Sequence, residues 1–111
     1  MPDGDIDHLL KRLKNNTSAE IYSDNFTKGR YATDASIYQM MPHGVLIPKT
    51  KEDLIQTINY ARESNTPLLA RGGGTSQCGQ TVNNALVIDN SKFLNKIIYF
   101  DKENMTCVVE P

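Results

Sequence analysis

Cysteine is scarce in this chain, and its placement excludes common site types. Only Cys78 and Cys107 occur among the 111 residues, with no C-x-x-C spacing and no histidine at a metal-ligand distance in sequence. Clustered cysteines and histidines mark zinc and iron–sulfur sites, so no metal site is predicted here. A disulfide between the two is not expected outside a secretory context.

Strong charge and long apolar runs are missing as well. The formal net charge is -1, which gives no electrostatic reason to expect a nucleic-acid partner. No apolar run is long enough for a transmembrane segment, and the acidic start MPDGDIDHLLKR differs from a signal peptide. With 39% hydrophobic and 23% charged residues, the chain has the composition of a globular protein. We therefore predict a cytoplasmic protein.

The first segment, residues 1–43, combines one helix with a long irregular stretch. A helical face over residues 6–14 is formed by Ile6, Leu9, Leu10 and Leu13. Residues 15–43 lack clean periodicity and are predicted to be irregular, with at most one helical turn. Their tyrosine, phenylalanine and methionine side chains are expected to pack this stretch down.

The second segment, residues 44–111, alternates strands with a helix. Apolar runs at 45–47 and 68–70 flank a helical pattern that begins at the capping sequence 50-TKED-53 and includes Ile55 and Ile58. This order predicts a right-handed βαβ unit with parallel strands. Further strands are expected at 86–89, 97–101 and 106–110, the last two joined as a hairpin through 102–104. The predicted class is α+β with a small mixed sheet, whose strand order stays open.

Both cysteines are expected to be packing residues. Cys107 alternates with apolar neighbours in the last predicted strand, and Cys78 is a small residue within a loop. The chain also stops directly after that strand, whereas a natural C-terminus usually leaves a polar tail. We therefore expect it to be the opening part of a longer polypeptide.

Three consecutive glycines, Gly72, Gly73 and Gly74, follow the strand at 68–70 and match neither familiar nucleotide signature. The triphosphatase loop G-x-x-x-x-G-K-[ST] fails because Gln80 stands where lysine is required. The dinucleotide fingerprint G-x-G-x-x-G fails because Gln77 replaces the third glycine and no helical pattern follows.

The chemistry of this loop nevertheless suits an anion. Glycines can expose consecutive N–H groups in a concave nest, and the loop leaves a strand end where α/β sheets bind ligands. Further donors are supplied by Arg71, Thr75, Ser76, Gln77 and Gln80. From this chemistry alone, a tight turn and an anion site are equally supported.

Several motifs together resemble one family. They are 31-YATDASIY-38, 45-VLIPKTKEDL-54, 67-PLLARGGGTS-76, 86-LVIDNSKFLNKI-97 and 108-VVEP-111. In this order and spacing they resemble the FAD-binding domain of flavoenzymes such as vanillyl-alcohol oxidase and para-cresol methylhydroxylase. Within that group the chain looks closest to D-lactate dehydrogenases and the glycolate-oxidase flavin subunit. The resemblance implies the first FAD-binding subdomain, incomplete at its C-terminus.

The resemblance also implies site residues and a cofactor. Arg71, Gly72, Gly73, Gly74, Thr75 and Ser76 would wrap the FAD pyrophosphate. The stretch Gln77, Cys78, Gln80 and Thr81 would lie along the cofactor toward the flavin ring, with the loop at Pro48 nearby. Some relatives bind flavin covalently through a histidine where this chain has Thr75, so the expected FAD is non-covalent.

The implied activity belongs to a larger enzyme. FAD would accept a hydride from a D-2-hydroxy acid, and the substrate-binding residues would lie beyond residue 111, so no catalytic residue is assigned here. An iron–sulfur domain or subunit elsewhere, and attachment of the whole enzyme at the inner membrane, remain open. Alternatives are a UDP-N-acetylenolpyruvoylglucosamine reductase-type flavoenzyme and a stand-alone, non-catalytic nucleotide- or anion-binding module.

Two acidic residues are expected to have local structural roles. Asp34, together with Ser36, is predicted to hydrogen-bond loop backbone at the entrance to the site. Asp89 and Ser91 are predicted to cap the segment leading to Leu94. His43 lies in a Pro-His-Gly turn and is expected at the surface.

Overall fold

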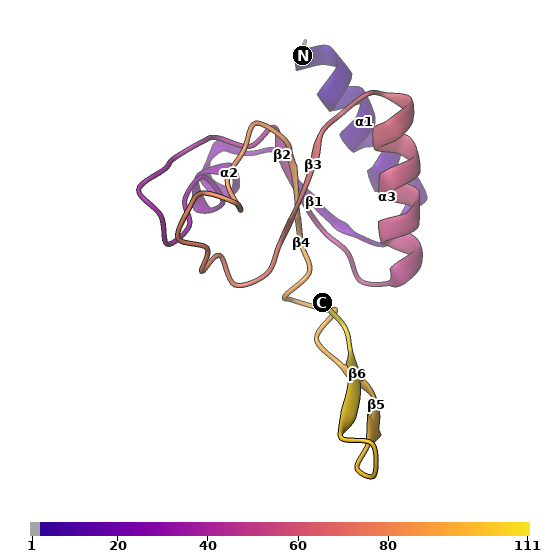
Figure 1. Cartoon of the computed structure of the whole chain (residues 1–111). Helices are drawn as coiled ribbons and strands as arrows, with labels where there is room; N and C mark the ends of the chain where they lie inside the picture. Colours follow the sequence, from indigo (N-terminus) through magenta and orange to yellow (C-terminus); the bar gives the residue numbers. More distant parts are fainter. Residues whose placement is uncertain (1–2) are drawn as a thin grey trace.

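The computed structural model describes residues 3–111. Along the chain the elements are α1 (Asp3–Asn16), β1 (Glu20–Tyr22), α2 (Asn25–Arg30), β2 (Gly44–Ile47), α3 (Lys51–Glu63), β3 (Leu68–Arg71), β4 (Leu86–Asp89), β5 (Ile97–Asp101) and β6 (Thr106–Val109). A central sheet carries α1 and α3 on one face and α2 with the long loops on the other (Figure 1). The β5–β6 hairpin extends away from this body.

The central sheet has four strands in the order β1-β2-β4-β3. Strands β2 and β3 both run parallel to β4, so that Leu46 and Ala70 lie on either side of Ile88. Strand β1 runs antiparallel to β2. The predicted βαβ unit is present as β2, α3 and β3, with β4 inserted between its two strands. The prediction of an α+β fold with a small mixed sheet is confirmed.

The hydrophobic core lies between the sheet and α1. Its buried members are Ile6, Leu9, Leu10, Leu13, Leu46, Leu86 and Ile88. The predicted apolar face of the first helix is confirmed, although the helix extends beyond residues 6–14 at both ends. Burying one such aliphatic side chain stabilises the fold by about 1.5–3 kcal/mol. The cluster therefore anchors helix α1 to strands β2 and β4 of the sheet.

Helix α3 begins at the predicted cap. The Thr50 hydroxyl accepts a hydrogen bond from the Asp53 N–H, and the Asp53 side chain accepts one from the Thr50 N–H. The buried face of the helix differs from its most apolar stripe, because Asp53, Thr57 and Ala61 are buried whereas Ile55 and Ile58 are exposed. The Asp53 carboxylate also accepts bonds from the Ser18 N–H and hydroxyl, which joins α3 to the end of α1.

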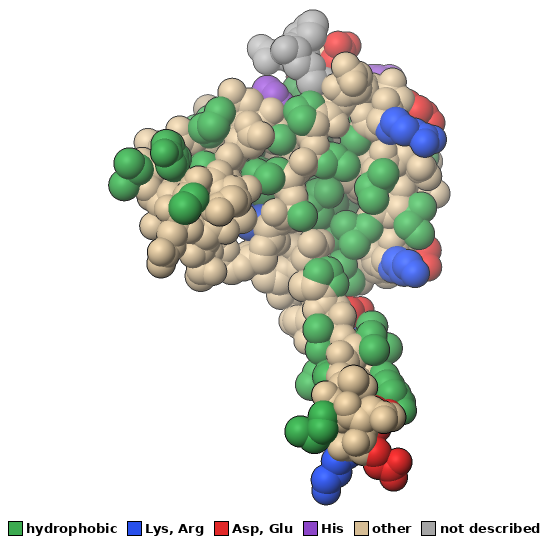
Figure 2. Space-filling model, viewed as in Figure 1, with side chains coloured by type: hydrophobic (Ala, Val, Ile, Leu, Met, Phe, Trp, Pro, Cys, Tyr) green, Lys and Arg blue, Asp and Glu red, His purple; other side chains and the backbone are tan. Residues whose placement is uncertain are grey.

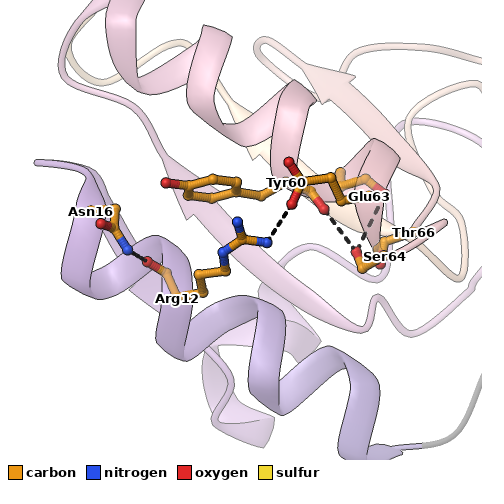
Figure 3. A network of polar contacts seen from close by, with 7 residues as sticks. Arg12, Asn16, Tyr60, Glu63, Ser64 and Thr66 are labelled. Atoms are coloured by element: carbon orange, nitrogen blue, oxygen red, sulfur yellow. Dashed lines mark hydrogen bonds and ion pairs between the residues drawn. The ribbon is translucent and has the colours of Figure 1, made fainter.

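A polar seam closes the outer edge between α1 and α3 (Figure 3). The Arg12 guanidinium lies 4.0 Å from the centroid of the Tyr60 ring and donates to the Glu63 carboxylate at 2.6 Å. Because Arg12 and Glu63 are both substantially exposed, this ion pair adds little stability by itself. It links Arg12 of α1 to Glu63 of α3 at the surface.

The stretch between α1 and β2 is more regular than predicted. Strand β1 was not predicted, whereas α2 fits the expected helical turn and is capped by the Asp24 carboxylate, which accepts from the Thr27 N–H at 2.8 Å. The prediction that large apolar side chains pack this stretch down was wrong for Phe26, Tyr38, Met40 and Met41, which are exposed, whereas Tyr22 and Tyr31 are half-buried. Small buried residues and hydrogen bonds to the loops hold it instead.

The β5–β6 hairpin forms a separate two-stranded sheet. The predicted hairpin is confirmed, with a connection one residue longer than predicted, at 102–105, and the Asp101 carboxylate accepts from the N–H groups of Glu103 and Asn104. Figure 2 shows its apolar side chains in the open, where Ile97, Ile98, Tyr99, Phe100, Val108 and Val109 are 51–71% exposed. Cys107 is exposed too. The prediction of a core cysteine was wrong because this strand lies outside the core.

Candidate functional site

The candidate site lies at the edge of the sheet where its three parallel strands end. Strand β2 ends before Pro48, β3 before Gly72 and β4 before Asn90. Because the three strands point the same way, the loops that follow them leave from one edge. This is where open parallel sheets bind ligands.

The glycine loop, residues 72–81, contains two kinds of glycine. A Cβ added at Gly72 meets nothing within 4 Å, and one at Gly73 meets only the Thr75 methyl, at 3.7 Å. Gly74 and Gly79 instead have φ values of +69° and +80°, which favour glycine. A Cβ at Gly74 would lie 3.0 Å from Cζ of Arg71, and one at Gly79 would lie 2.8 Å from the Tyr38 ring. The first pair leaves open space, and the second pair shapes the loop.

The first half of this loop presents unpaired donors. Within the part of the chain that the structure describes, the N–H groups of residues 72–76 meet no acceptor. Residues 72, 73 and 75 are exposed and the other two are half-buried. Consecutive unpaired N–H groups around glycines can hold an anion such as a phosphate.

Arg71 shapes the loop from within. Its Nη1 donates to the backbone oxygens of Tyr31 and Thr81, each at 3.3 Å. Its Cζ lies 5.2 Å from the centroid of the Tyr31 ring. The guanidinium therefore ties the start of the loop to its end, and its positive charge stays within the loop, close to the unpaired N–H groups.

The segment before β2 contacts the loop at two further points. The Ala35 N–H donates to the Gly74 oxygen at 3.1 Å. The Asp34 Oδ2 accepts from the Thr81 hydroxyl at 3.0 Å and from the Thr81 N–H at 3.4 Å. The predicted bonding of Asp34 to loop backbone is confirmed, and Ser36 contributes its own N–H to Asp34 Oδ1 at 2.8 Å.

A recess of about 220 Å³ opens beside the glycine loop, between Gly72 and Gly73 on one side and Arg30, Tyr31, Asp89 and Ser91 on the other. The Tyr31 hydroxyl donates to Asp89 Oδ2 at 2.5 Å. Burial, together with this bond to a carboxylate, raises the pKa of Tyr31 to about 12. Asp89 Oδ1 accepts from the Ser91 N–H and hydroxyl, which confirms the predicted local cap.

The remaining predicted site residues occupy varied positions. Pro48 directly follows β2, and its side chain is fully buried. Gln77 is exposed, and the Gln80 side chain accepts from the Cys78 N–H at 3.1 Å. Cys78 is itself exposed, and its predicted role as a buried packing residue was wrong because this loop runs over the surface.

Sequence reasoning missed two features of this edge, the Tyr31–Asp89 hydrogen bond and the buried Asn90. No sequence pattern connects Tyr31 with Asp89, because they are 58 residues apart. Asn90 follows β4 and is only 8% exposed, yet its Oδ1 has no hydrogen-bond partner among the described residues. A polar residue directly after a buried strand was the available signal for Asn90.

Among residues 3–111, no group of three or more His, Cys, Asp or Glu side chains is arranged to hold a metal ion. No helix in the same range has the length and apolar character required to span a membrane.

Residues 42–111 match a protein family described as FAD binding domain. The chain is 33% identical over 96 residues to a D-2-hydroxyglutarate dehydrogenase of Pantoea ananatis. The matched region makes up 84% of this chain and 9% of that protein. It is 34% identical over 93 residues to the glycolate oxidase subunit GlcD of Bacillus subtilis. That matched region makes up 79% of this chain and 20% of the GlcD protein. The chain thus spans a fifth or less of these two relatives.

Solved structures share the fold at low identity. An alkyldihydroxyacetonephosphate synthase superposes with a TM-score of 0.77 at 16% identity, over 91% of this chain and 21% of that one. A 4-ethylphenol oxidase from Gulosibacter chungangensis superposes with a TM-score of 0.75 at 14% identity, over 93% of this chain and 21% of that one. These similarities bear on the fold alone.

Proposed function

The chain belongs to the FAD binding domain family, and on that premise we propose that its glycine loop binds the pyrophosphate of FAD. The observation that carries this proposal is the row of unpaired N–H groups at residues 72–76, with open space at Gly72 and Gly73. Side chains at these two positions would occupy the space that a pyrophosphate needs. Hydrogen bonds from N–H groups to a charged acceptor are among the stronger ones in proteins.

The other residues of the loop have supporting roles in this proposal. Arg71 adds positive charge while holding the loop closed, and Thr75 and Ser76 add hydroxyl donors. Gln77, Cys78, Gln80 and Thr81 continue along the cofactor, and the backbone at Pro48 borders it. Thr75 cannot form the histidyl–flavin bond, so the FAD is held non-covalently. Bound FAD supplies a hydride acceptor, while these residues bind and orient it.

We further propose that the protein carrying this chain oxidises a 2-hydroxy acid. The support is that curated relatives at 33–36% identity are D-2-hydroxyglutarate dehydrogenases and a glycolate oxidase subunit. Those proteins are several times longer than this chain, so the groups that bind and deprotonate the substrate would lie in polypeptide outside it. An iron–sulfur domain or subunit and a cytoplasmic location stay predictions.

The cofactor proposal is tested by titrating the chain with FAD, ADP and inorganic pyrophosphate in a calorimeter. The critical variant is Gly73→Val, because position 73 has room for a Cβ and no left-handed backbone, so the fold should be kept. Losing even one N–H bond to the charged pyrophosphate costs about 1.5–3 kcal/mol, which is about ten- to a hundredfold in affinity.

The matched control is Gly29→Val in α2, where an added Cβ also meets nothing within 4 Å and no ligand contact is proposed. It should bind FAD as the natural chain does. Wild-type affinity in Gly73→Val, or no binding of FAD or pyrophosphate by the natural chain, would refute the assignment of the loop. Equal binding of ADP and FAD, with no flavin in the full-length protein, would favour a stand-alone nucleotide-binding module.

A further inference from the structure

We propose that Asp34 is a positioning residue for the glycine loop: it fixes the far end of the loop through Thr81 and so holds the N–H groups of residues 72–76 in a binding arrangement. This inference rests on the proposed function only where it predicts a change in FAD affinity. The mechanical part, that Asp34 orders the loop, holds for the chain without any ligand.

The loop between Gly74 and Thr81 is anchored at both ends by one short segment. Ala35 donates its N–H to the Gly74 oxygen, and the neighbouring Asp34 accepts two bonds from Thr81. Within the described chain, the residues between these anchors, 75–80, make only local hydrogen bonds: the Cys78 N–H donates to the Gln80 side chain, and the Gly79 oxygen accepts from the Val82 N–H at 3.5 Å. The geometry of the loop therefore depends on contacts 47 residues away in sequence.

Asp34 is itself held in position. Its Oδ1 accepts from the Ser36 N–H, and the Ser36 hydroxyl accepts from the Tyr38 N–H at 3.1 Å. The Tyr38 ring lies against Gly79, where a Cβ would come within 2.8 Å of the ring. The segment 34–38 thus contacts the loop at Gly74, Gly79 and Thr81, and the Asp34 carboxylate is the polar centre of these contacts.

The charge state of Asp34 suits this role. Hydrogen bonds from Ser36 and from Thr81 lower the pKa of Asp34 to about 2. The side chain is therefore an ionised acceptor throughout the neutral range, and it can accept from Ser36 and Thr81 at the same time. An asparagine would keep one accepting oxygen and place a donor where the other acceptor was.

Pre-ordering the loop affects binding because a flexible loop must lose conformational freedom when it closes on a ligand. Arg71 donates to the Thr81 oxygen and lies beside Gly74, but it makes no hydrogen bond to residues 75–80 within the described chain. Without Asp34 the N–H groups of residues 72–76 would sample many orientations. We expect FAD affinity to fall on the order of tenfold.

The test compares Asp34→Ala and Thr81→Val with the conservative variant Thr81→Ser, which keeps the hydroxyl donor. The matched control is Asp101→Ala, another turn aspartate that accepts backbone N–H bonds, but in the distant hairpin. Amide order parameters from NMR relaxation are measured on each ligand-free chain. Calorimetric titration with FAD and pyrophosphate follows.

We expect order parameters for residues 74–81 to fall from about 0.85 to below about 0.6 in Asp34→Ala and Thr81→Val, with β3 and β4 unchanged. Thr81→Ser should keep a rigid loop, and Asp101→Ala should keep both a rigid loop and natural affinity. Unchanged loop order in both disruptive variants would overturn the inference, whatever FAD does, and so would a loosened loop that binds FAD with natural affinity. Failure of the natural chain to bind FAD or pyrophosphate would instead overturn the proposed function.

Discussion

Replacing Tyr31 by phenylalanine removes one hydroxyl from the candidate site and leaves the ring beneath Arg71. In the natural chain that hydroxyl donates to Asp89 Oδ2 at 2.5 Å, and Asp89 is only 8% exposed. The variant leaves a buried carboxylate with its Ser91 bonds alone. A hydrogen bond to a charged group contributes about 1.5–3 kcal/mol to stability, and partial exposure of Tyr31 reduces this contribution. We therefore expect the free energy of unfolding to fall by about 1–2 kcal/mol in Tyr31→Phe.

The pH dependence gives this prediction a second signature. The pKa of Tyr31 is raised from 10.0 to about 12, so the folded state favours the protonated phenol. The stability that it contributes is fully present below pH 10 and is lost as the pH rises through about 12. The natural chain should therefore lose its advantage over Tyr31→Phe in that alkaline window, and the difference between the two curves isolates this one group from other titrations.

Urea unfolding followed by circular dichroism, at neutral pH and at steps up to about pH 12, measures both effects. The control is Tyr22→Phe, whose hydroxyl makes only a 3.4 Å bond to Glu20 and which should cost less than about 0.5 kcal/mol. The reasoning fails if Tyr31→Phe unfolds within about 0.3 kcal/mol of the natural chain, or if the difference between them persists unchanged at the alkaline end.

Two further substitutions test buried polar groups. Asp53→Asn should lower the free energy of unfolding by about 2–3 kcal/mol, because the amide NH2 would face either the Ser18 N–H at Oδ1 or the Lys49 and Thr50 N–H groups at Oδ2, and the remaining bonds would lose their charged acceptor. Burial acts to raise the pKa of Asp53, but those hydrogen bonds bring it below 3.8, so in urea titrations the difference should shrink as the pH falls through that lowered value; a constant difference would contradict this. Asn90→Leu should raise the free energy of unfolding in urea by about 1 kcal/mol, because it removes a buried acceptor that has no partner among the described residues. A lower free energy of unfolding would instead indicate that Asn90 Oδ1 is hydrogen-bonded to water.

The sequence predicted those features that depend on local pattern. The apolar face of α1, the cap of α3 and the order strand, helix, strand each follow from residues a few positions apart, and the structure confirms them. The glycine loop was likewise located from its neighbours, and the family match includes it. In these cases burial and capping within one element decide the outcome.

Features that depend on distant contacts were missed. Nothing in the pattern of α3 indicates that Thr57 is buried while Ile58 is exposed, because Asp53 turns that face toward Ser18, 35 residues away. Strand β1 is only three residues long, too short to show a period, and forms because β2 offers it an edge. Cys107 alternates correctly for a strand, but alternation does not reveal whether another layer covers it.

The insertion of β4 between β2 and β3 has a consequence for how the protein is made. Synthesis delivers β2, α3 and β3 before β4, so the growing chain has two strands whose facing edges lack their native partner until residue 89 has emerged. Unpaired edges of this kind are sites of aggregation. The sheet edge that carries the candidate site cannot exist earlier, since all three strand ends come together only when β4 enters. Ribosome-bound chains in which β4 has not emerged should therefore depend on chaperones more than those in which it has emerged.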